Sequence, residues 1–192
     1  PTARRRSSER SPRWQALLAD VWETMAGDAA AESTLWGDCL LPDAERDASP
    51  VFSPLGEARY ALGLETIYEG YLVHYGRPRL FAPADDDTAL LLGDYLYAHG
   101  VARISALHEV AAVADLSDLI SLCSQLRAED ADGDGQLWAA TAALLGRGEL
   151  DEARTALRLH SDPVQLDRLA RGAAGDGAVD EALVAHFMRR PA

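Results

Sequence analysis

The sequence contains no lysine, because all 18 of its basic residues are arginine. Without a lysine amine, the chain cannot form a Schiff base with a substrate or supply the lysine of a phosphate-binding P-loop. Positive charge is also scarce overall, since the net charge is −13 and the isoelectric point is about 4.7. Binding to nucleic-acid phosphates depends on clustered cationic side chains. We therefore expect no nucleic-acid partner.

Cysteine and long apolar runs are equally scarce. Cys39 and Cys123 lie far apart and without CxxC spacing, so the sequence indicates neither a zinc site nor a disulfide framework. No apolar run approaches the roughly 20 residues of a transmembrane helix. The first residues, "PTARRRSSERSP", lack the apolar core of a signal peptide. We expect a flexible basic tail over residues 1–11 and a cytoplasmic protein.

Strand signals are absent too. β-branched residues are few, and no long stretch alternates between apolar and polar residues. Apolar residues instead recur at helical spacing through most of the chain. The sequence thus predicts an all-α fold, a single-domain helical bundle over residues 12–192. The segments expected to be helical are 14–25, 54–74, 88–106, 110–126, 136–148, 149–160, 162–172 and 178–190, with a short helix near 32–41.

Motifs for catalysis are missing. The five histidines are scattered, with no HExxH pair, and no serine lies in a GxSxG turn. The stretch "EDADGDGQLW" resembles the start of a calcium loop, with Asp130, Asp132 and Asp134 at alternating positions. Its twelfth position, where such a loop needs a carboxylate, is Thr141. We interpret the stretch as a polar turn between helices, and we assign no catalytic residue.

A run of three aspartates precedes the segment "TALLLGDYLYAHG". Asp85, Asp86 and Asp87 could bind magnesium, but acidic residues before a helix also suit the positive end of its dipole. Capping, by Asp87 or Thr88, is the reading that physical chemistry favours.

The order of segments around this run resembles the trans-polyprenyl diphosphate synthases, which have the class I isoprenoid synthase fold. Gly76, Arg77 and Pro78 match part of the family's RRGxPT-like turn, and Gly93 to Leu96 match its GDYL motif. Thr141 to Ala143 lie in register with the family's KTAALF helix. The resemblance covers residues 55–148. It implies an isoprenoid synthase-like bundle and a link to isoprenoid biosynthesis.

The departures from the family concern its catalytic residues. Members hold magnesium ions on two Asp-rich motifs, and the ions neutralise the leaving diphosphate. In this chain "YLVH" runs directly into "YGRPRLF", so the first motif is missing, and no second motif follows residue 148. Ala140 stands where the family has its diphosphate-binding lysine. The resemblance therefore implies a shortened member without the catalytic signature.

Three hypotheses remain open. The first is a non-catalytic protein that acts as a subunit or regulatory partner, in a homo- or hetero-oligomer, or that binds a prenyl or isoprenoid diphosphate ligand. It would need no firm cofactor. We expect a helix-helix seam at Leu90 to Leu92, Tyr95 and Leu96. An apolar prenyl groove would lie between this helix and the helix of Ile67, Tyr71 and Leu72.

The second hypothesis is a minimal isoprenyl diphosphate transferase. Its magnesium would be held by Asp85, Asp86, Asp87 and Asp94, and its diphosphate by Arg77 and Arg79. Candidate ligand-binding residues over the two hypotheses are Arg77, Arg79, Asp94, Tyr71 and Tyr95. Glu65 and Glu69 are the only candidates for a second carboxylate cluster, and we interpret them as a solvated or partially buried polar face. The third hypothesis, a helical-repeat scaffold, rests on a similarity between residues 144–159 and 172–187.

Overall fold

The computed structural model describes residues 12–190 and, within that range, the side chains from Asp20 onward. The expected basic tail, residues 1–11, lies outside the described residues. Over the described range the chain forms nine α-helices and no strand, so the predicted all-α bundle is confirmed. An isolated antiparallel bridge joins Leu40 to Phe81.

The helices follow one another closely along the chain. Three short 3-10 turns, η1 (Asp43–Glu45), η2 (Ser53–Leu55) and η3 (Ala58–Tyr60), occupy the long connection before the third α-helix. The α-helices are α1 (Pro12–Glu32), α2 (Thr34–Asp38), α3 (Ala61–Tyr75), α4 (Asp86–Ser105), α5 (Val110–Ala128), α6 (Asp134–Leu144), α7 (Asp151–His160), α8 (Val164–Ala174) and α9 (Asp176–Phe187).

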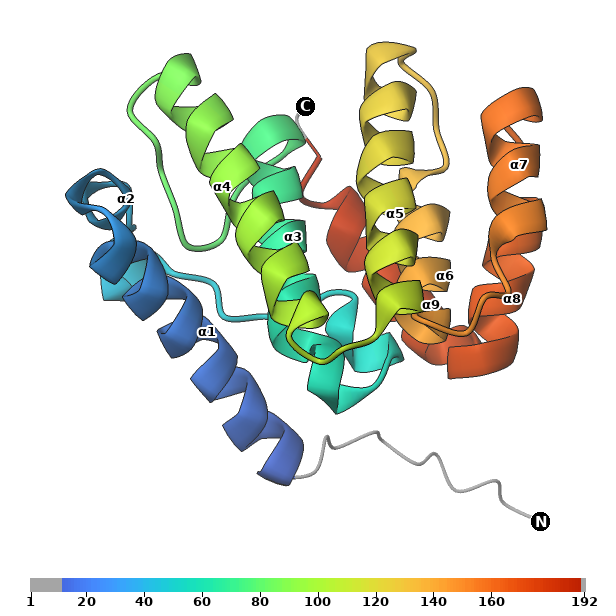
Figure 1. Ribbon diagram of the computed structural model, residues 1–192, viewed down its shortest axis with the longest axis horizontal. Coiled ribbons are helices and arrows are strands. Elements are labelled where there is room, and N and C mark those ends of the chain that lie inside the picture. The colour runs from blue at the N-terminus through green and yellow to red at the C-terminus, as the bar shows by residue number, and fades with distance from the viewer. Residues whose placement is uncertain (1–11, 191–192) are drawn as a thin grey trace.

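Figure 1 shows α1 at one side, sloping in the same direction as α4; α3 lies behind α4, α5 stands more upright beside α4, and α7 lies at the opposite edge. Helix α6 packs mainly on α8 and also contacts α5 and α9. The two segments that suggested a helical repeat fall on α7 and α9. None of the helices in the described part of the chain has the length and apolar character needed to cross a membrane.

Helix α3 is largely enclosed by the rest of the bundle. Most of its residues are buried, including its two glutamates, and it ends at Tyr75, with Gly76 as its C-cap, just before the Arg77-Pro78 pair. Proline restricts the residue before it to extended backbone, so a helix cannot continue through this point. The helix begins at Ala61 rather than at Pro54, because the residues before it form η2 and η3.

Helices α3 and α4 approach each other through four glycines. A β-carbon at Gly100 would lie 2.9 Å from the carbonyl oxygen of Gly63, and one at Gly70 would lie 3.0 Å from that of Gly93. At these two crossings the backbones are nearly in contact, which leaves no room for a prenyl chain between them. The expected groove between α3 and α4 is therefore closed at both points.

The helix-helix seam differs in part from the expectation. Leu92 and Leu96 are buried as predicted, and Tyr95 is half-buried, stacked on Trp36. Leu90 and Leu91 were expected at the seam, but they are 56% and 57% exposed. The reason is geometric: α4 contacts α3 with its glycine-bearing side, and residues 90 and 91 fall outside that side.

The acidic run before α4 caps the helix. Asp85 is the N-cap residue, and its carboxylate accepts a hydrogen bond of 2.7 Å from the backbone N–H of Thr88. Asp86 and Asp87 occupy the first turn, where negative charge is favoured by the helix dipole. The capping interpretation is thus supported, but the cap is Asp85 and not Asp87 or Thr88.

The glycine contact yields a stability prediction. Gly100→Ala should lower the free energy of unfolding by about 1–3 kcal/mol, because the added carbon meets backbone atoms that cannot move aside easily. Gly27→Ala in α1 is the matched control, since nothing lies within 4 Å of its β-carbon position. There alanine should stabilise the helix by about 0.5–1 kcal/mol. Urea unfolding measures the free energy of unfolding of both variants. Equal changes in Gly100→Ala and Gly27→Ala would refute the close approach of α3 and α4.

Candidate functional site

A buried ion-pair cluster joins α3 to the loop that follows it. Arg79 lies in this loop and its side chain is fully buried. Its Nη1 lies 2.6 Å from Oε2 of Glu65, and its Nε lies 2.9 Å from Oε2 of Glu69. Both glutamates project from the same face of α3, one helical turn apart, so a single guanidinium can contact the two carboxylates together.

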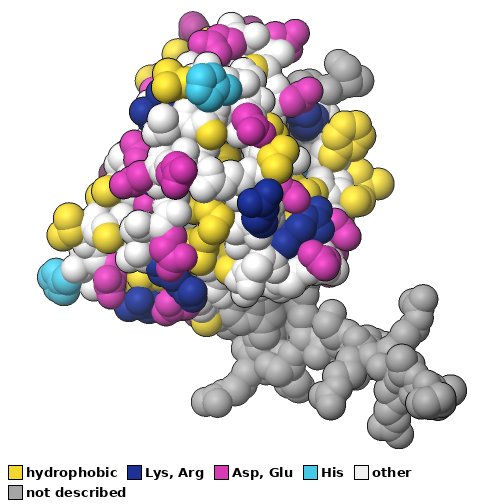
Figure 2. Space-filling view, turned by 90° about the vertical axis from the view of Figure 1, so that its right-hand side faces the viewer, with side chains coloured by type: hydrophobic (Ala, Val, Ile, Leu, Met, Phe, Trp, Pro, Cys, Tyr) yellow, Lys and Arg dark blue, Asp and Glu magenta, His cyan; other side chains and the backbone are white. Residues whose placement is uncertain are grey.

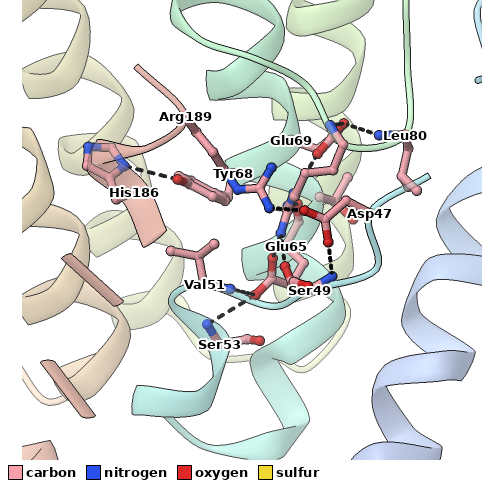
Figure 3. Close-up of polar contacts among 12 residues, drawn as sticks. Asp47, Ser49, Val51, Ser53, Glu65, Tyr68, Glu69, Leu80, His186 and Arg189 are labelled. Carbon is pink, nitrogen blue, oxygen red and sulfur yellow. Dashed lines mark hydrogen bonds and ion pairs between the residues drawn. The ribbon is translucent and has the colours of Figure 1, made fainter. Parts of the chain in front are cut away.

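The same carboxylates also hold loop backbone. Oε1 of Glu69 accepts hydrogen bonds from the N–H groups of Arg79 and Leu80, and Oε1 of Glu65 accepts from those of Val51 and Ser53. Figure 3 shows these bonds converging on α3 from two separate loops. Each carboxylate therefore fastens one loop to the helix and has no free oxygen for a metal ion.

The charge of Arg79 is well compensated. Burial alone would lower the pKa of Arg79, but the two carboxylates outweigh this effect and hold the pKa above its ordinary value. The guanidinium also lies 4.5 Å from the ring centroid of Trp22 and 4.9 Å from that of Tyr68. Such cation–π contacts add to its stabilisation when water is excluded.

Two expectations about this cluster need correction. Glu65 and Glu69 were expected on a solvated or partially buried polar face, but they are 1% and 0% exposed. Arg79 was a candidate ligand for a diphosphate, yet its Nε, Nη1 and Nη2 all have partners inside the protein. The sequence spacing of Glu65 and Glu69 revealed a shared helical face, but it did not reveal which charge that face would meet.

A second polar network is centred on Asp134, at the start of α6. Its Oδ2 accepts hydrogen bonds from Tyr71 of α3 and Arg127 of α5, and it lies 3.1 Å from Nε2 of His186 on α9. The other ring nitrogen of His186 lies 3.0 Å from the hydroxyl of Tyr68. One carboxylate thus connects four helices, and Asp134, read from the sequence as part of a turn, is a buried anchor.

Burial and charge determine how these groups ionise. Burial alone would raise the pKa of Asp134, but contacts with His186, Tyr71 and Arg127 hold the pKa below its ordinary value. Burial raises the pKa of Tyr68 and of Tyr71 well above that of free tyrosine. At neutral pH the carboxylate is charged and both phenols keep their protons.

The order Tyr68, His186, Asp134 resembles a hydroxyl–imidazole–carboxylate catalytic triad. Such a triad needs a hydroxyl that a substrate can reach and that the imidazole can deprotonate. Tyr68 is 1% exposed, and its raised pKa opposes deprotonation. The arrangement therefore ties α9 to α3 and does not provide an accessible nucleophile.

Aromatic rings fill the space around this network. Phe52 stacks on Trp138 at a centroid distance of 5.6 Å, and Tyr68 meets Trp138 edge-on at 5.0 Å. Tyr71 packs against the same indole at 5.7 Å. Trp138 belongs to α6, the helix that the resemblance aligns with the family's KTAALF helix. The region between α3 and α6 is thus a packed aromatic core.

The other candidate ligand residues are dispersed. Asp94 lies on the exposed side of α4, 3.3 Å from His74, and Arg77 bonds through its side chain to the carbonyl of Met188. Asp85, Asp86 and Asp87 are exposed at the start of α4. Tyr71 is buried in the Asp134 network, and Tyr95 faces α2. The structure does not bring these residues into one site.

The residues described by the structure contain no group of three or more His, Cys, Asp or Glu side chains arranged to hold a metal ion. In the loop that resembled a calcium motif, Asp132 pairs with Arg190 at 3.1 Å and Asp134 belongs to the buried network. Asp130 adopts a left-handed backbone conformation with φ of 50°. The carboxylates of Asp132 and Asp134 are thus already paired with Arg190 and, for Asp134, with the buried network.

Two clefts flank the Asp134 network, each with a volume of about 530 Å³. Cleft A is lined by His74, Tyr75, Gly76, Ser124, Arg127 and Ala128. Cleft B is lined by residues 132–136 and, from the C-terminal segment, Leu183, Val184, His186, Phe187 and Arg190. Sequence reasoning missed both clefts, because Arg127 and His186 stand in no motif and are brought to Asp134 only by the fold.

Comparisons of the chain with protein-family models, with curated proteins and with solved structures found no match.

The ion-pair cluster predicts a large effect of removing its cation. Arg79→Met should lower the free energy of unfolding by about 3–5 kcal/mol, because two buried carboxylates would lose their counter-charge. Arg158→Met, at an exposed position of α7, is the control and should change stability by less than about 0.5 kcal/mol. Chemical denaturation of both variants provides the comparison, and similar small effects would show that Arg79 is not an anchor.

Asp134 predicts a pH dependence of stability. Because its pKa is lowered on folding, the ionised carboxylate stabilises the fold fully above its unfolded pKa of about 3.9. This stabilisation should be lost progressively as the pH falls below about 5 towards 2. Asp134→Asn should be less stable at pH 7 and should show a shallower acid-side decline in the free energy of unfolding.

Asp130→Asn is the control for this measurement, since residue 130 is exposed and asparagine tolerates its left-handed backbone. It should follow the pH profile of the unsubstituted protein. A profile of Asp134→Asn parallel to that of the unsubstituted protein would contradict the assignment.

Proposed function

We propose that this protein is a non-catalytic relative of the trans-polyprenyl diphosphate synthases, a pseudoenzyme that acts by binding a partner protein as a subunit or regulator. One observation carries the proposal: the region between α3 and α6 is filled. The aromatic rings around Trp138 occupy it, the Arg79 cluster fills the space between α3 and its flanking loops, and the glycine crossings close the space between α3 and α4 at two points. An apolar tunnel with carboxylates at its mouth would have favoured catalysis instead.

The alternative of a minimal magnesium-dependent transferase has less support. Its proposed metal ligands, Asp85 to Asp87, cap α4, and Asp94 lies apart from them next to His74. Its proposed second carboxylate pair, Glu65 and Glu69, is committed to Arg79 and to backbone N–H groups. The helical-repeat alternative gains no observation of its own, since its two units fall on α7 and α9, which are not among the helix pairs that pack closely on each other.

Partner binding is supported by an apolar surface at the end of α9. Val184, Phe187 and Met188 are 59%, 70% and 64% exposed, beside cleft B. Figure 2 views the side on which α7 lies in Figure 1 and shows hydrophobic side chains exposed between acidic ones. Exposed apolar clusters with polar borders are typical of interaction sites. The complementary partner surface is therefore apolar at its centre.

The partner that this proposal names is a catalytic prenyl synthase of the same cell, in the cytoplasm. Affinity purification from the native source should recover a prenyl synthase, identified by peptides that contain its Asp-rich motifs. Val184→Asp combined with Phe187→Asp should reduce that recovery at least tenfold, because it places charge in an apolar contact, and it should leave the unfolding temperature nearly unchanged.

A matched control places the same charges on α8 and α7, at Val164 and Leu159, which are also exposed. Val164→Asp with Leu159→Asp should leave the recovery unchanged. If the unsubstituted protein recovers no prenyl synthase, the partner role is wrong. If both double variants lower recovery equally, α9 is not the contact surface.

A further inference from the structure

Cleft A has the composition of a small-molecule site that neither the resemblance nor the proposed partner role explains. It lies where the C-terminal ends of α3 and α5 meet, with His74 and Tyr75 on one side and Ser124, Arg127 and Ala128 on the other. Its volume of about 530 Å³ falls within the range of roughly 300–1,000 Å³ that ligand pockets occupy.

Arg127 supplies a pre-positioned cation at this cleft. Its Nε donates a hydrogen bond of 2.9 Å to the Tyr71 hydroxyl, and its Nη2 donates to the same hydroxyl and to Asp134. These bonds fix one edge of the guanidinium. The remaining nitrogen, Nη1, has no partner among the described residues and is not among the buried polar atoms without one, so it is open to solvent.

The charge of Arg127 is only partly neutralised inside the protein. Asp134 is its one carboxylate partner, and this carboxylate is shared with His186 and, at 3.6 Å, with Arg190. The unshared edge of the guanidinium thus retains capacity for a second anion. Arginine binds carboxylate and phosphate groups readily because its donors match their planar or tetrahedral oxygens.

The remaining walls are mainly apolar and aromatic. The rings of His74 and Tyr75 lie 5.5 Å apart, and burial lowers the pKa of His74, so its ring is uncharged at neutral pH. The methyl group of Ala128 borders the cleft on the solvent side. The Ser124 hydroxyl already donates to the carbonyl of Ile120, so it adds little polarity. One cationic donor therefore faces a largely apolar surface.

We propose that cleft A binds a small organic anion, a carboxylate or phosphate monoester with a short apolar body, whose head group contacts Nη1 of Arg127. The apolar body lies against Tyr75 and Ala128. This inference does not depend on partner binding, because cleft A and the exposed α9 side chains Val184, Phe187 and Met188 are different residues.

Isothermal titration calorimetry with four probes tests this proposal. Octanoate and octyl phosphate present the two possible head groups on the same chain, octanol lacks the charge, and inorganic phosphate lacks the chain. At least one of the two octyl anions should bind saturably, and at least tenfold more tightly than octanol or inorganic phosphate. The tighter of the two identifies the head group.

Variants locate the binding. Ala128→Trp should abolish saturable binding by filling the cleft from an exposed position, whereas Ala173→Trp, at an exposed position of α8, should leave it unchanged. Arg127→Gln should weaken the octyl anion at least tenfold and bring its affinity near that of octanol. Arg127→Gln also removes a hydrogen bond to Asp134. If this variant does not fold, Ala128→Trp alone tests whether the anion binds in cleft A.

Three results would overturn the proposal. They are the absence of saturable binding for both octyl anions at millimolar concentration, equal affinity for octanol, and unchanged affinity in Ala128→Trp.

Discussion

The buried contact of Arg79 with Glu65 and Glu69 is the constraint on which the rest of the structure depends. A guanidinium removed from water is stable only if its charge and its donors are satisfied, and here two carboxylates one turn apart on α3 satisfy both. The same carboxylates accept hydrogen bonds from the backbone N–H groups of residues 51, 53, 79 and 80. The position of α3 therefore also fixes the positions of two loops. Those loops carry the Leu40–Phe81 bridge and the residues that lead into η2.

The Asp134 network extends this order to the second half of the chain. By accepting hydrogen bonds from α3 and α5 and contacting α9, Asp134 places the aromatic ring of Trp138 against those of Tyr68 and Phe52. The C-terminal residues are held from the other side, where the N–H of Arg77 donates to the carbonyl of Arg189 at 2.9 Å. Two buried polar clusters therefore leave a packed centre, and clefts A and B lie at its margins.

Much of the fold was predictable from local patterns, because helical periodicity and the absence of strand signals are properties of neighbouring residues. The segments around α4, α5 and α8 begin and end within a few residues of their predicted bounds. The burial of Leu92 and Leu96 followed from the same periodicity. The exposure of Leu90 and Leu91 did not, because it depends on the glycine-to-glycine approach of α3 and α4.

The site was far less predictable, for a physical reason. Arg79 and Glu65 are 14 positions apart, and Asp134 and His186 are 52 apart, so no motif records their contact. Glu65 and Glu69 looked like a polar surface because a charged helical face is exposed unless a counter-charge is supplied from elsewhere. The absence of a metal motif in the sequence was visible, but the aromatic packing that fills the space between α3 and α6 was not.

The proposed loss of catalysis rests on this filled centre, and phosphorus NMR tests it most directly. The protein is mixed with geranyl diphosphate, isopentenyl diphosphate and magnesium, and the phosphorus resonances are followed over hours. The account predicts that both substrate signals persist and that no inorganic diphosphate forms. Release of inorganic diphosphate above the rate of a protein-free sample would contradict it.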